Sequence, residues 1–508
     1  MSRAGSALDR RRFLALTASL GAAAVAPGCL GTPASARGFS TSELRDLDGV
    51  AMAERVRAGD LAPRTLVAHA RDAIEALDPA LNAVVTKFYD HAFALAERVD
   101  RSRPFAGVPY LIKDLSEYAG FRTTFGSRMN ANHVSTRTTP IVEAAVDAGL
   151  VPLGKTNTPE SGQLPTTEPL AYGATRNPWN PAYSAGGSSG GSGAAVAAGM
   201  VPLASSSDGG GSIRIPACNC GVFGLKASRG RNIGSNAAPL WFSVKGVISR
   251  SVRDTARFLQ STERTDAAAP LPPVGFVAGP GTRRLKIGLI EAGVGRLAPT
   301  DEVRDAVLQA AALCRSLGHD VRETDFPESV HAMGDAMMNA TAQQIAAMAD
   351  GVEARLGRAV DEREFEPWTL QILAHARKID APTRAASIAH LERLTRDTHA
   401  LFDRFDLLLM PVLATRAVKI GHLSPKAEFG FEEMLRRNQN YVAYTTVFNI
   451  SGDPAMSVPL SWTEDGIPIG SQFAARTGDE ATLLAMAYEI EQARPWRDRH
   501  PPTSIWRG

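Results

Sequence analysis

The sequence predicts an α/β fold, in which helices alternate along the chain with the strands of one central sheet. Short apolar runs typical of buried strands alternate with longer segments of helical periodicity, most clearly over residues 106–260. The chain has 508 residues, of which 44% are hydrophobic and 21% charged, an ordinary globular balance that can bury a large core. We therefore expect residues 37–508 to form a single large domain.

The remaining elements follow from local patterns. Pro63 suits the first turn of a helix, where a missing N–H costs nothing, and Thr300 is expected to cap another helix. Residues 263–284, rich in Ala, Pro and Gly, predict a surface connection, and residues 328–400 predict a methionine-containing helical excursion. The other expected helices cover residues 42–58, 63–77, 92–99 and 301–317, and the other strands cover residues 82–87, 285–290, 407–412 and 455–460.

Two serine clusters in glycine-rich turns flank a small-residue segment of helical length within GGSSGGSGAAVAAGMVPLASSSDGGGSIR, residues 186–214. Upstream, in GVPYLIKDL, Lys113 is the one lysine in an apolar run that predicts the end of a buried strand. Serine, serine and lysine together suggest a hydrolase that activates a hydroxyl group with a neutral amine.

Lys113 can serve as a base only in its neutral form. The free pKa of lysine is about 10.4, so that roughly one lysine in 2,500 is neutral at pH 7. Burial in an apolar site can supply the required decrease of about 3 units, roughly 4 kcal/mol. Taken alone, Lys113 would also fit a lysine at a strand end whose charge is balanced by Asp114. The serine clusters favour the first interpretation.

Three glycines precede a serine in the second cluster, Asp208-Gly209-Gly210-Gly211-Ser212. Consecutive glycines let the backbone direct several N–H groups into one concavity, which suits a developing oxyanion. Ser212 is then the natural nucleophile. The alternative of a phosphate-binding loop is disfavoured because no Gly-Lys-Ser/Thr follows.

The first cluster also fits the G-x-S-x-G pattern of a nucleophile elbow, with Ser189 at its centre. An elbow requires a strand before the serine, and residues 183–186 are a poor strand. This alternative, a serine esterase that depends on Ser189 and a histidine, is kept as the weaker one.

The chain resembles the amidase signature family, which hydrolyses carboxamides with a Ser–cis-Ser–Lys triad. The resemblance covers most of the chain and implies a mixed central β-sheet covered on both faces by helices. It rests on specific motifs in family order and spacing: FAGVPYLIKD, GLVPLGKTNTPE, GATRNPWNP, AGGSSGGS, DGGGSIRIPA, GVFGLKAS, FDLLLMPV and FNISGDPAMSVPL.

The resemblance implies a role for each matching residue. Ser212 would be the nucleophile that accepts the acyl group, Ser188 the bridging serine on a cis peptide bond, and Lys113 the base. Ser188 would relay protons between Lys113 and Ser212. The oxyanion hole would consist of the backbone amides of Gly209, Gly210, Gly211 and Ser212. Ser189, Asp208 and Arg214 would support the site.

Within the family, the chain is most similar to the branch of the 6-aminohexanoate cyclic-dimer hydrolases, which suggests a cyclic or linear amide as substrate. The methionine-containing excursion is implied to help line the acyl pocket. The chain departs from the pattern in LASSSDGGG and IPACNCGVFG, where Cys218 and Cys220 lie next to the site and are expected to shift specificity.

The composition argues against several other classes of protein. The net charge of +2 and the lack of a Lys/Arg stripe with interleaved aromatics disfavour nucleic-acid binding. The ten histidines are scattered, and none forms an HExxH motif or pairs with cysteines at ligand spacing. We therefore expect neither a metal nor a cofactor, only a small-molecule amide substrate. Whether the protein forms a homodimer is left open.

The N-terminus predicts export to the periplasm or medium. Arg10-Arg11-Arg12-Phe13-Leu14 fits the twin-arginine pattern, and a short Ala/Gly/Leu segment follows it. Residues 1–36 would be the signal peptide, recognised by the twin-arginine export machinery and cleaved before Arg37. A lipoprotein anchored at Cys29 is disfavoured, because Leu or Val is expected three residues before such a cysteine. The remaining cysteines are expected to be buried free thiols.

Two functions from different classes remain open beside the esterase. The first is an exported amide hydrolase. The second is a non-catalytic or partner-dependent amidase-like protein, which the intact set of Lys113, Ser188 and Ser212 argues against.

Overall fold

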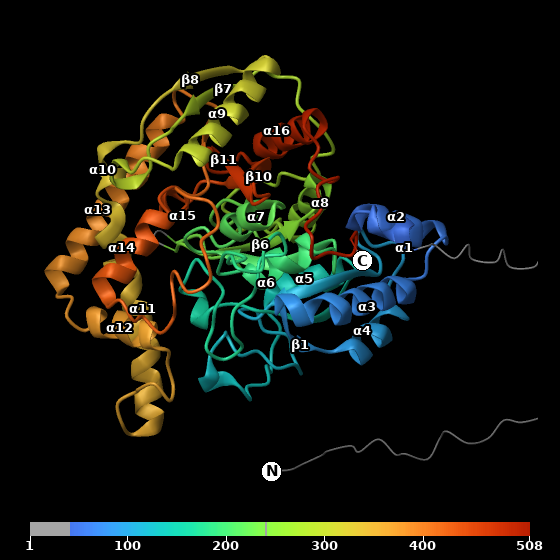
Figure 1. The fold of residues 1–508 in the computed structure, drawn as a ribbon, viewed down its shortest axis with the longest axis horizontal. Coiled ribbons are helices and arrows are strands. Elements are labelled where there is room, and N and C mark those ends of the chain that lie inside the picture. Colours follow the sequence, from blue (N-terminus) through green and yellow to red (C-terminus); the bar gives the residue numbers. More distant parts are fainter. Residues whose placement is uncertain (1–40, 239–240, 508) are drawn as a thin grey trace, which may run out of the picture. The chain divides into compact units, whose positions relative to one another are not determined.

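The protein is described from a computed structural model, and the described residues are 41–238 and 241–507. Within them, eleven strands form one continuous sheet, which runs through the centre of the molecule (Figure 1). In spatial order the strands are β1 (Val84–Lys87), β3 (Leu150–Thr156), β2 (Val108–Lys113), β4 (Leu203–Asp208), β6 (Val244–Ser249), β5 (Phe223–Lys226), β10 (Ala455–Trp462), β11 (Pro468–Ala475), β9 (Leu407–Pro411), β7 (Lys286–Leu289) and β8 (Asp320–Glu323).

The sheet is mixed. Strand β2 runs parallel to its neighbours β3 and β4, and β7 runs parallel to its neighbours β9 and β8. Between β4 and β9 in the spatial order, every pair of adjacent strands is antiparallel. Parallel strands need crossover connections, and helices provide them here. The predicted α/β fold, a large domain with a mixed sheet between helices, is confirmed.

Helices cover both faces of this sheet (Figure 1). Their bounds are α1 (Thr41–Arg45), α2 (Gly49–Ala58), α3 (Pro63–Leu81), α4 (Tyr89–Ala96), α5 (Pro140–Asp147), α6 (Gly190–Ala197), α7 (Arg214–Cys220), α8 (Val252–Thr262), α9 (Asp301–Ser316), α10 (Glu328–His331), α11 (Met333–Leu356), α12 (Pro367–Ala376), α13 (Ala381–Leu401), α14 (Phe431–Tyr441), α15 (Thr446–Ser451) and α16 (Glu480–Ala493).

Several expected elements differ in detail. The single helix expected over residues 42–58 is two helices, because the carboxylate of Asp48 accepts a hydrogen bond from the amide of Ala51 and starts α2 anew. Thr300 does precede α9, but its side chain makes no capping hydrogen bond. The helical excursion is present as α10–α13, and residues 263–284 contain neither helix nor strand.

The alternation of side chains along β2 decides where Lys113 points. Val108, Tyr110 and Ile112 pack into the core on the side of α2 and α5, whereas Leu111 packs on the side of α3, α4 and α6. Because successive side chains of a strand point to opposite faces, Lys113 follows Leu111 toward α6. The serines that precede α6 lie on the same side.

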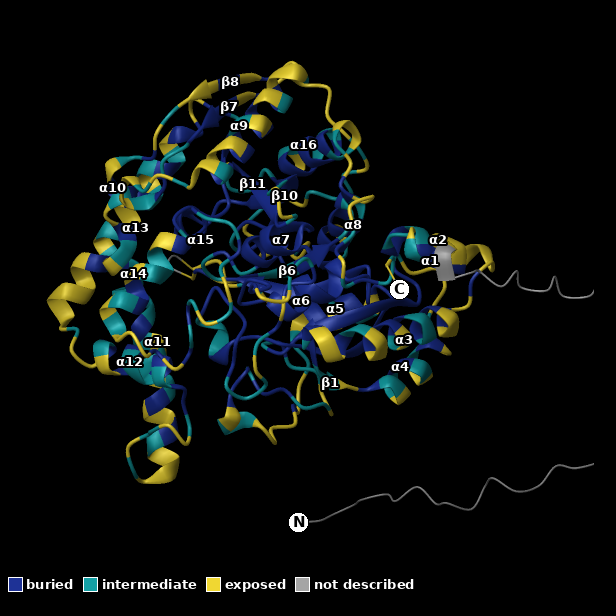
Figure 2. Ribbon diagram, viewed as in Figure 1, coloured by how far each residue is buried: buried dark blue, intermediate teal, exposed yellow. Residues whose placement is uncertain are grey.

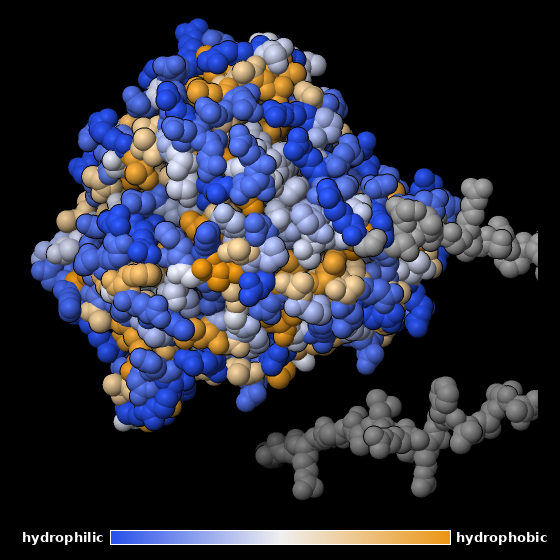
Figure 3. All heavy atoms as spheres, in the orientation of Figure 1, coloured by the Kyte–Doolittle hydropathy of each residue, from blue (hydrophilic) through white to orange (hydrophobic). Residues whose placement is uncertain are grey.

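The core strands are buried along their whole length, and exposure is concentrated on the outer helices (Figure 2). The face shown in Figure 3 is a mosaic in which hydrophilic residues predominate over small hydrophobic patches. None of the helices in the described residues has the length and apolar character needed to cross a lipid bilayer. The predicted signal peptide and Cys29 lie outside the described residues.

Candidate active site

Lys113 is the last residue of β2, and its side chain is buried. Its Nζ atom lies within hydrogen-bond distance of three serine hydroxyls, at 2.7 Å from Ser188, 2.8 Å from Ser189 and 3.0 Å from Ser207. Ser188 and Ser189 come from the turn before α6, and Ser207 comes from β4. The structure therefore joins Lys113 with Ser188 and Ser189, as expected, and adds Ser207.

The surroundings of Lys113 favour the neutral amine. Burial away from water, together with the positive charge of Lys245, holds the pKa of Lys113 well below its usual range, and the negative charge of Asp208 acts in the opposite direction. Asp114 does not balance the charge of Lys113. Its carboxylate accepts hydrogen bonds from the backbone and the hydroxyl of Thr124 instead, so the structure does not support the alternative of a simple ion pair.

The hydrogen bonds around Lys113 leave the hydroxyls of Ser188 and Ser207 able to donate to its lone pair, and the family resemblance assigns this role to Ser188. A neutral lysine amine has two N–H donors and one lone pair. The hydroxyl of Ser189 donates to the carbonyl of Ser207, and can therefore only accept from Lys113. The described residues give the hydroxyl of Ser188 no partner other than Lys113. Ser188 is thus free to donate to the lone pair.

The turn that carries Ser188 is closely packed. The peptide bond between Gly187 and Ser188 is cis, as the family resemblance implied. A Cβ atom at residue 187 would lie 2.6 Å from the carbonyl oxygen of Thr166, so only glycine allows this close approach. The neighbouring Gly186 has a φ of 81°, in the region that favours glycine.

Ser212 lies with Ser188 on the wall of a cavity of about 660 Å³. The hydroxyl of Ser212 makes no hydrogen bond to any described residue, and the expected contact with Ser188 is not formed in this structure. Hydrogen bonds of catalytic groups are often long without substrate and tighten when it binds. The hydroxyls of Ser188 and Ser212 therefore line the same cavity but form no hydrogen bond with each other.

The glycine loop before Ser212 is held by an ion pair. Asp208 accepts hydrogen bonds from Nε and Nη2 of Arg214, each at 2.9 Å, and both side chains are fully buried. The carboxylate of Asp208 also accepts a hydrogen bond from the amide of Gly211 at 2.7 Å. The amide of Gly211 therefore already donates to Asp208 and is not available to an oxyanion. This corrects the expected set of four oxyanion donors. The described residues leave the amides of Gly209, Gly210 and Ser212 without a partner.

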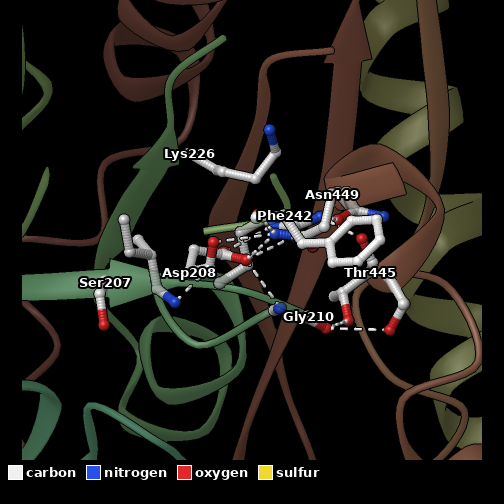
Figure 4. Close-up of polar contacts among 12 residues, drawn as sticks. Ser207, Asp208, Gly210, Lys226, Phe242, Thr445 and Asn449 are labelled. Atoms are coloured by element: carbon white, nitrogen blue, oxygen red, sulfur yellow. Dashed lines mark hydrogen bonds and ion pairs between the residues drawn. The ribbon is translucent and has the colours of Figure 1, made fainter. Parts of the chain in front are cut away.

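A second segment, distant in sequence, holds the same loop (Figure 4). The hydroxyls of Thr445 and Thr446 donate to the carbonyl of Gly210, at 2.6 and 3.1 Å. The side-chain amide of Asn449 donates to the carboxylate and the carbonyl of Asp208. Ser207 directs its hydroxyl away from this network in Figure 4, and its partner is Lys113.

Sequence analysis missed this second segment and Ser207. Thr445, Thr446 and Asn449 lie in or next to the FNISGDPAMSVPL motif, which carried no chemical signal of its own. Ser207 lies in the unusual tract LASSSDGGG, and the two-residue period of a strand would have placed Ser205 and Ser207 on one face.

The cavity wall is mostly apolar, and the helical excursion contributes to it as expected. Its apolar residues include Leu115, Leu164, Ile215, Met333, Met337 and Met338. Among the described residues that line it, only His331 and Asp335 carry ionisable side chains. Gln163 also belongs to the cavity wall, and its side-chain nitrogen and oxygen are buried without a hydrogen-bond partner among the described residues.

Cys218 and Cys220 are buried free thiols, as expected for the described cysteines, but they do not belong to the cavity wall. The Cys218 thiol accepts a hydrogen bond from the amide of Gly470, and Cys220 donates to the carbonyl of Ala185. Burial raises the pKa of Cys218 to about 12, so the group is an inert thiol. The structure gives no support to a direct effect of these cysteines on specificity.

Comparison with known proteins identifies the family. The family profile described as Amidase matches residues 65–484, which is most of the chain. This chain belongs to the amidase signature family. AmiC of Mycobacterium tuberculosis, whose name describes it as an amidase, is 37% identical over 468 residues, covering 91% of this chain and 98% of that protein.

Three further comparisons carry names that state an activity. The 6-aminohexanoate-cyclic-dimer hydrolase of Paenarthrobacter ureafaciens is 36% identical over 486 residues, covering 89% of this chain and 96% of that protein. A solved structure of a 6-aminohexanoate cyclic dimer hydrolase with its substrate superposes with a TM-score of 0.82 at 32% identity, covering 90% and 99% of the two chains. A bacterial aryl acylamidase superposes with a TM-score of 0.81 at 28% identity, covering 90% and 98%. This amidase is an amide-hydrolysing enzyme.

Proposed function

We propose that the protein is an exported amidase that hydrolyses neutral amides through an acyl-enzyme on Ser212. The observation that carries the proposal is the buried Lys113–Ser188 pair at the wall of the cavity that contains Ser212. The twin-arginine pattern at residues 10–14 supports export.

The first half of the reaction forms the acyl-enzyme. Neutral Lys113 accepts the proton of Ser188, which in turn accepts the proton of Ser212. The oxygen of Ser212 attacks the carbonyl carbon, and the negative charge on the carbonyl oxygen is stabilised by the free backbone amides of the glycine loop. The carbon–nitrogen bond then breaks, and the leaving amine takes a proton from Ser188, which Lys113 replenishes.

The second half releases the acid. A water molecule gives one proton to Ser188, which passes its own proton to Lys113, and the water oxygen attacks the ester carbon on Ser212. The bond to Ser212 breaks, and the serine oxygen recovers the proton. The sum is one amide and one water converted to one carboxylic acid and one amine, with the three side chains restored.

The cavity wall supports neutral substrates with an apolar acyl part. A carboxylate would find no Lys or Arg among the described lining residues to balance its charge, and leaving a charge unpaired in a buried site is costly. Substrates of this kind include the 6-aminohexanoate cyclic dimer named for two relatives.

The test is hydrolysis of a panel by the wild type and by Ser212→Ala. The panel contains 6-aminohexanoate cyclic dimer, a p-nitroanilide, a C-terminal peptide amide and a fatty amide. Ser243→Ala is the matched control, because Ser243 lines the same cavity but is exposed and outside the proposed machinery. We expect activity on at least one amide in the wild type and in the control, and none in Ser212→Ala. Equal activity in all three proteins would overturn the assignment of Ser212.

A further inference from the structure

Lys245 is a second lysine close to the proposed base. It lies on β6 directly opposite Ser207 on β4, and the hydroxyl of Ser207 accepts a hydrogen bond from Lys113. The Nζ atom of Lys245 donates to the hydroxyl of Ser116 at 3.2 Å, and the amide of Ser116 donates to the carbonyl of Lys113 at 2.9 Å. Lys245 is therefore connected to the surroundings of Lys113 through Ser207 on one side and Ser116 on the other.

The nearby carboxylates are occupied elsewhere. The negative charge of Asp208, next to Ser207 on β4, acts on Lys113, but two N–H groups of Arg214 bind this carboxylate. Asp114, next to Lys113, accepts hydrogen bonds from Thr124. The negative charge of Glu117 acts on Lys245. Its carboxylate, however, accepts a hydrogen bond from Nε of Arg137 at 2.6 Å and lies 4.0 Å from Nε2 of His133. These acidic groups are paired with other partners, and the negative charge of Asp208 opposes the effect of Lys245 on Lys113 only in part.

The remaining neighbours of β2 do not oppose the effect of Lys245 on Lys113. Lys155 on β3 adds a further positive charge, and it donates to the carbonyl of Ser116 and the hydroxyl of Thr123. Helix α6 carries no ionisable side chain. The charged side chains of α2 are exposed, and the buried ionisable residue of α3, Asp78, binds the amides of Ala83 and Val84.

We propose that Lys245 is a positioning residue for catalysis, whose ammonium group keeps Lys113 in its neutral, proton-accepting form at neutral pH. This inference rests on the proposed function, in which Lys113 is the base. Like charges disfavour each other's charged form, and the charge of Lys245 lowers the pKa of Lys113 in addition to the larger effect of burial. Lys245 is not among the described residues that line the cavity, so we assign it no contact with the substrate.

The experiment measures labelling of Ser212 by a fluorophosphonate probe from about pH 5.5 to pH 10, which reports activation of the nucleophile without a known substrate. Lys245→Gln removes the charge and can still donate to Ser116, whereas Lys245→Arg keeps the charge. We expect the acid limb of the labelling rate in Lys245→Gln to move up by about one pH unit, a roughly tenfold loss near pH 7. At the alkaline end the rate should stay within about twofold of the wild type, and Lys245→Arg should keep the wild-type profile.

Controls separate this inference from the proposed function. Lys286→Met removes an exposed lysine at the start of β7 and should leave the profile unchanged. An unshifted profile in Lys245→Gln, or an equal loss at every pH in the Gln and Arg variants, would show that Lys245 does not act through the charge on Lys113. Labelling that persists in Ser212→Ala or Lys113→Ala, or a wild type that is not labelled, would instead contradict the proposed function itself.

Discussion

The side-chain nitrogen of Lys113 lies 2.7 Å from the hydroxyl oxygen of Ser188, although 75 residues separate them in the chain. Lys113 ends a strand and Ser188 precedes a helix, and the alternation along β2 turns the lysine toward that helix. A buried amine next to a hydroxyl without another partner is an arrangement suited to proton transfer.

Lys113→Ala should reduce the rate of acylation by roughly 100- to 10,000-fold, because this is what general-base catalysis contributes. The measurement is single-turnover acylation with whichever panel amide the wild type hydrolyses. Ser243→Ala, on the same cavity wall, should acylate at the wild-type rate. An unimpaired Lys113→Ala would mean that another group activates the nucleophile.

The acylation rate of the wild type should rise with pH. Lys113 is active when neutral, and its lowered pKa places the onset of activity below the usual range of lysine. Single-turnover rates between about pH 5 and pH 10 should therefore increase along one acid limb and then level off. A rate that stayed flat across this interval would exclude a titrating lysine as the base.

Lys113→Met should be inactive but more stable than the wild type at neutral pH. The folded protein holds Lys113 neutral, whereas the unfolded chain binds a proton up to the free pKa of about 10.4. This difference lowers the stability of the wild type at pH 7, and the cost disappears as the pH rises to the free pKa. Urea unfolding should show a stability gain near pH 7 that vanishes near pH 10. A variant less stable at both values would show that hydrogen bonds to Lys113 outweigh its burial.

Asp208→Asn should lower both activity and stability. The substitution leaves the fully buried Arg214 without its counter-charge, and breaking a buried ion pair typically costs about 3–5 kcal/mol of unfolding free energy. It also weakens the anchor of the Gly211 amide, so the oxyanion loop loses its geometry. Denaturant unfolding and single-turnover acylation measure the two effects. Asp465→Asn, which disrupts the half-exposed pair with Arg416, should change neither appreciably.

Glu366→Gln should weaken the dependence of stability on pH. Burial and the negative charge of Glu160 raise the pKa of Glu366 to about 8, so the folded protein keeps a proton that the unfolded chain releases. The folded state binds more protons between about pH 4 and pH 8, and the stability of the wild type falls as the pH rises through this window. Melting temperatures should decrease less over that window in Glu366→Gln than in the wild type. Glu143→Gln, at an exposed position, should follow the wild type, and parallel curves for all three proteins would contradict the prediction.

Much of the fold follows from local patterns. The apolar run before Lys113, the proline that opens α3 and the helical periodicity of residues 328–400 each predicted an element that the structure contains. Local patterns did not predict β11 or α16. They also predicted one helix where the structure has α1 and α2, because the capping hydrogen bond at Asp48 depends on side-chain geometry.

The sequence by itself determined the family and predicted Lys113, Ser188 and Ser212 as the catalytic residues, because glycine-rich turns, a lone lysine in an apolar run and the family motifs are local signals. Only the tertiary structure decided which groups surround them. It directs Thr445 to the carbonyl of Gly210, places Lys245 opposite Ser207 and turns Asp114 away from Lys113. Such contacts join segments that are distant in sequence or depend on one rotamer, and neither leaves a periodic pattern that can be read along the chain.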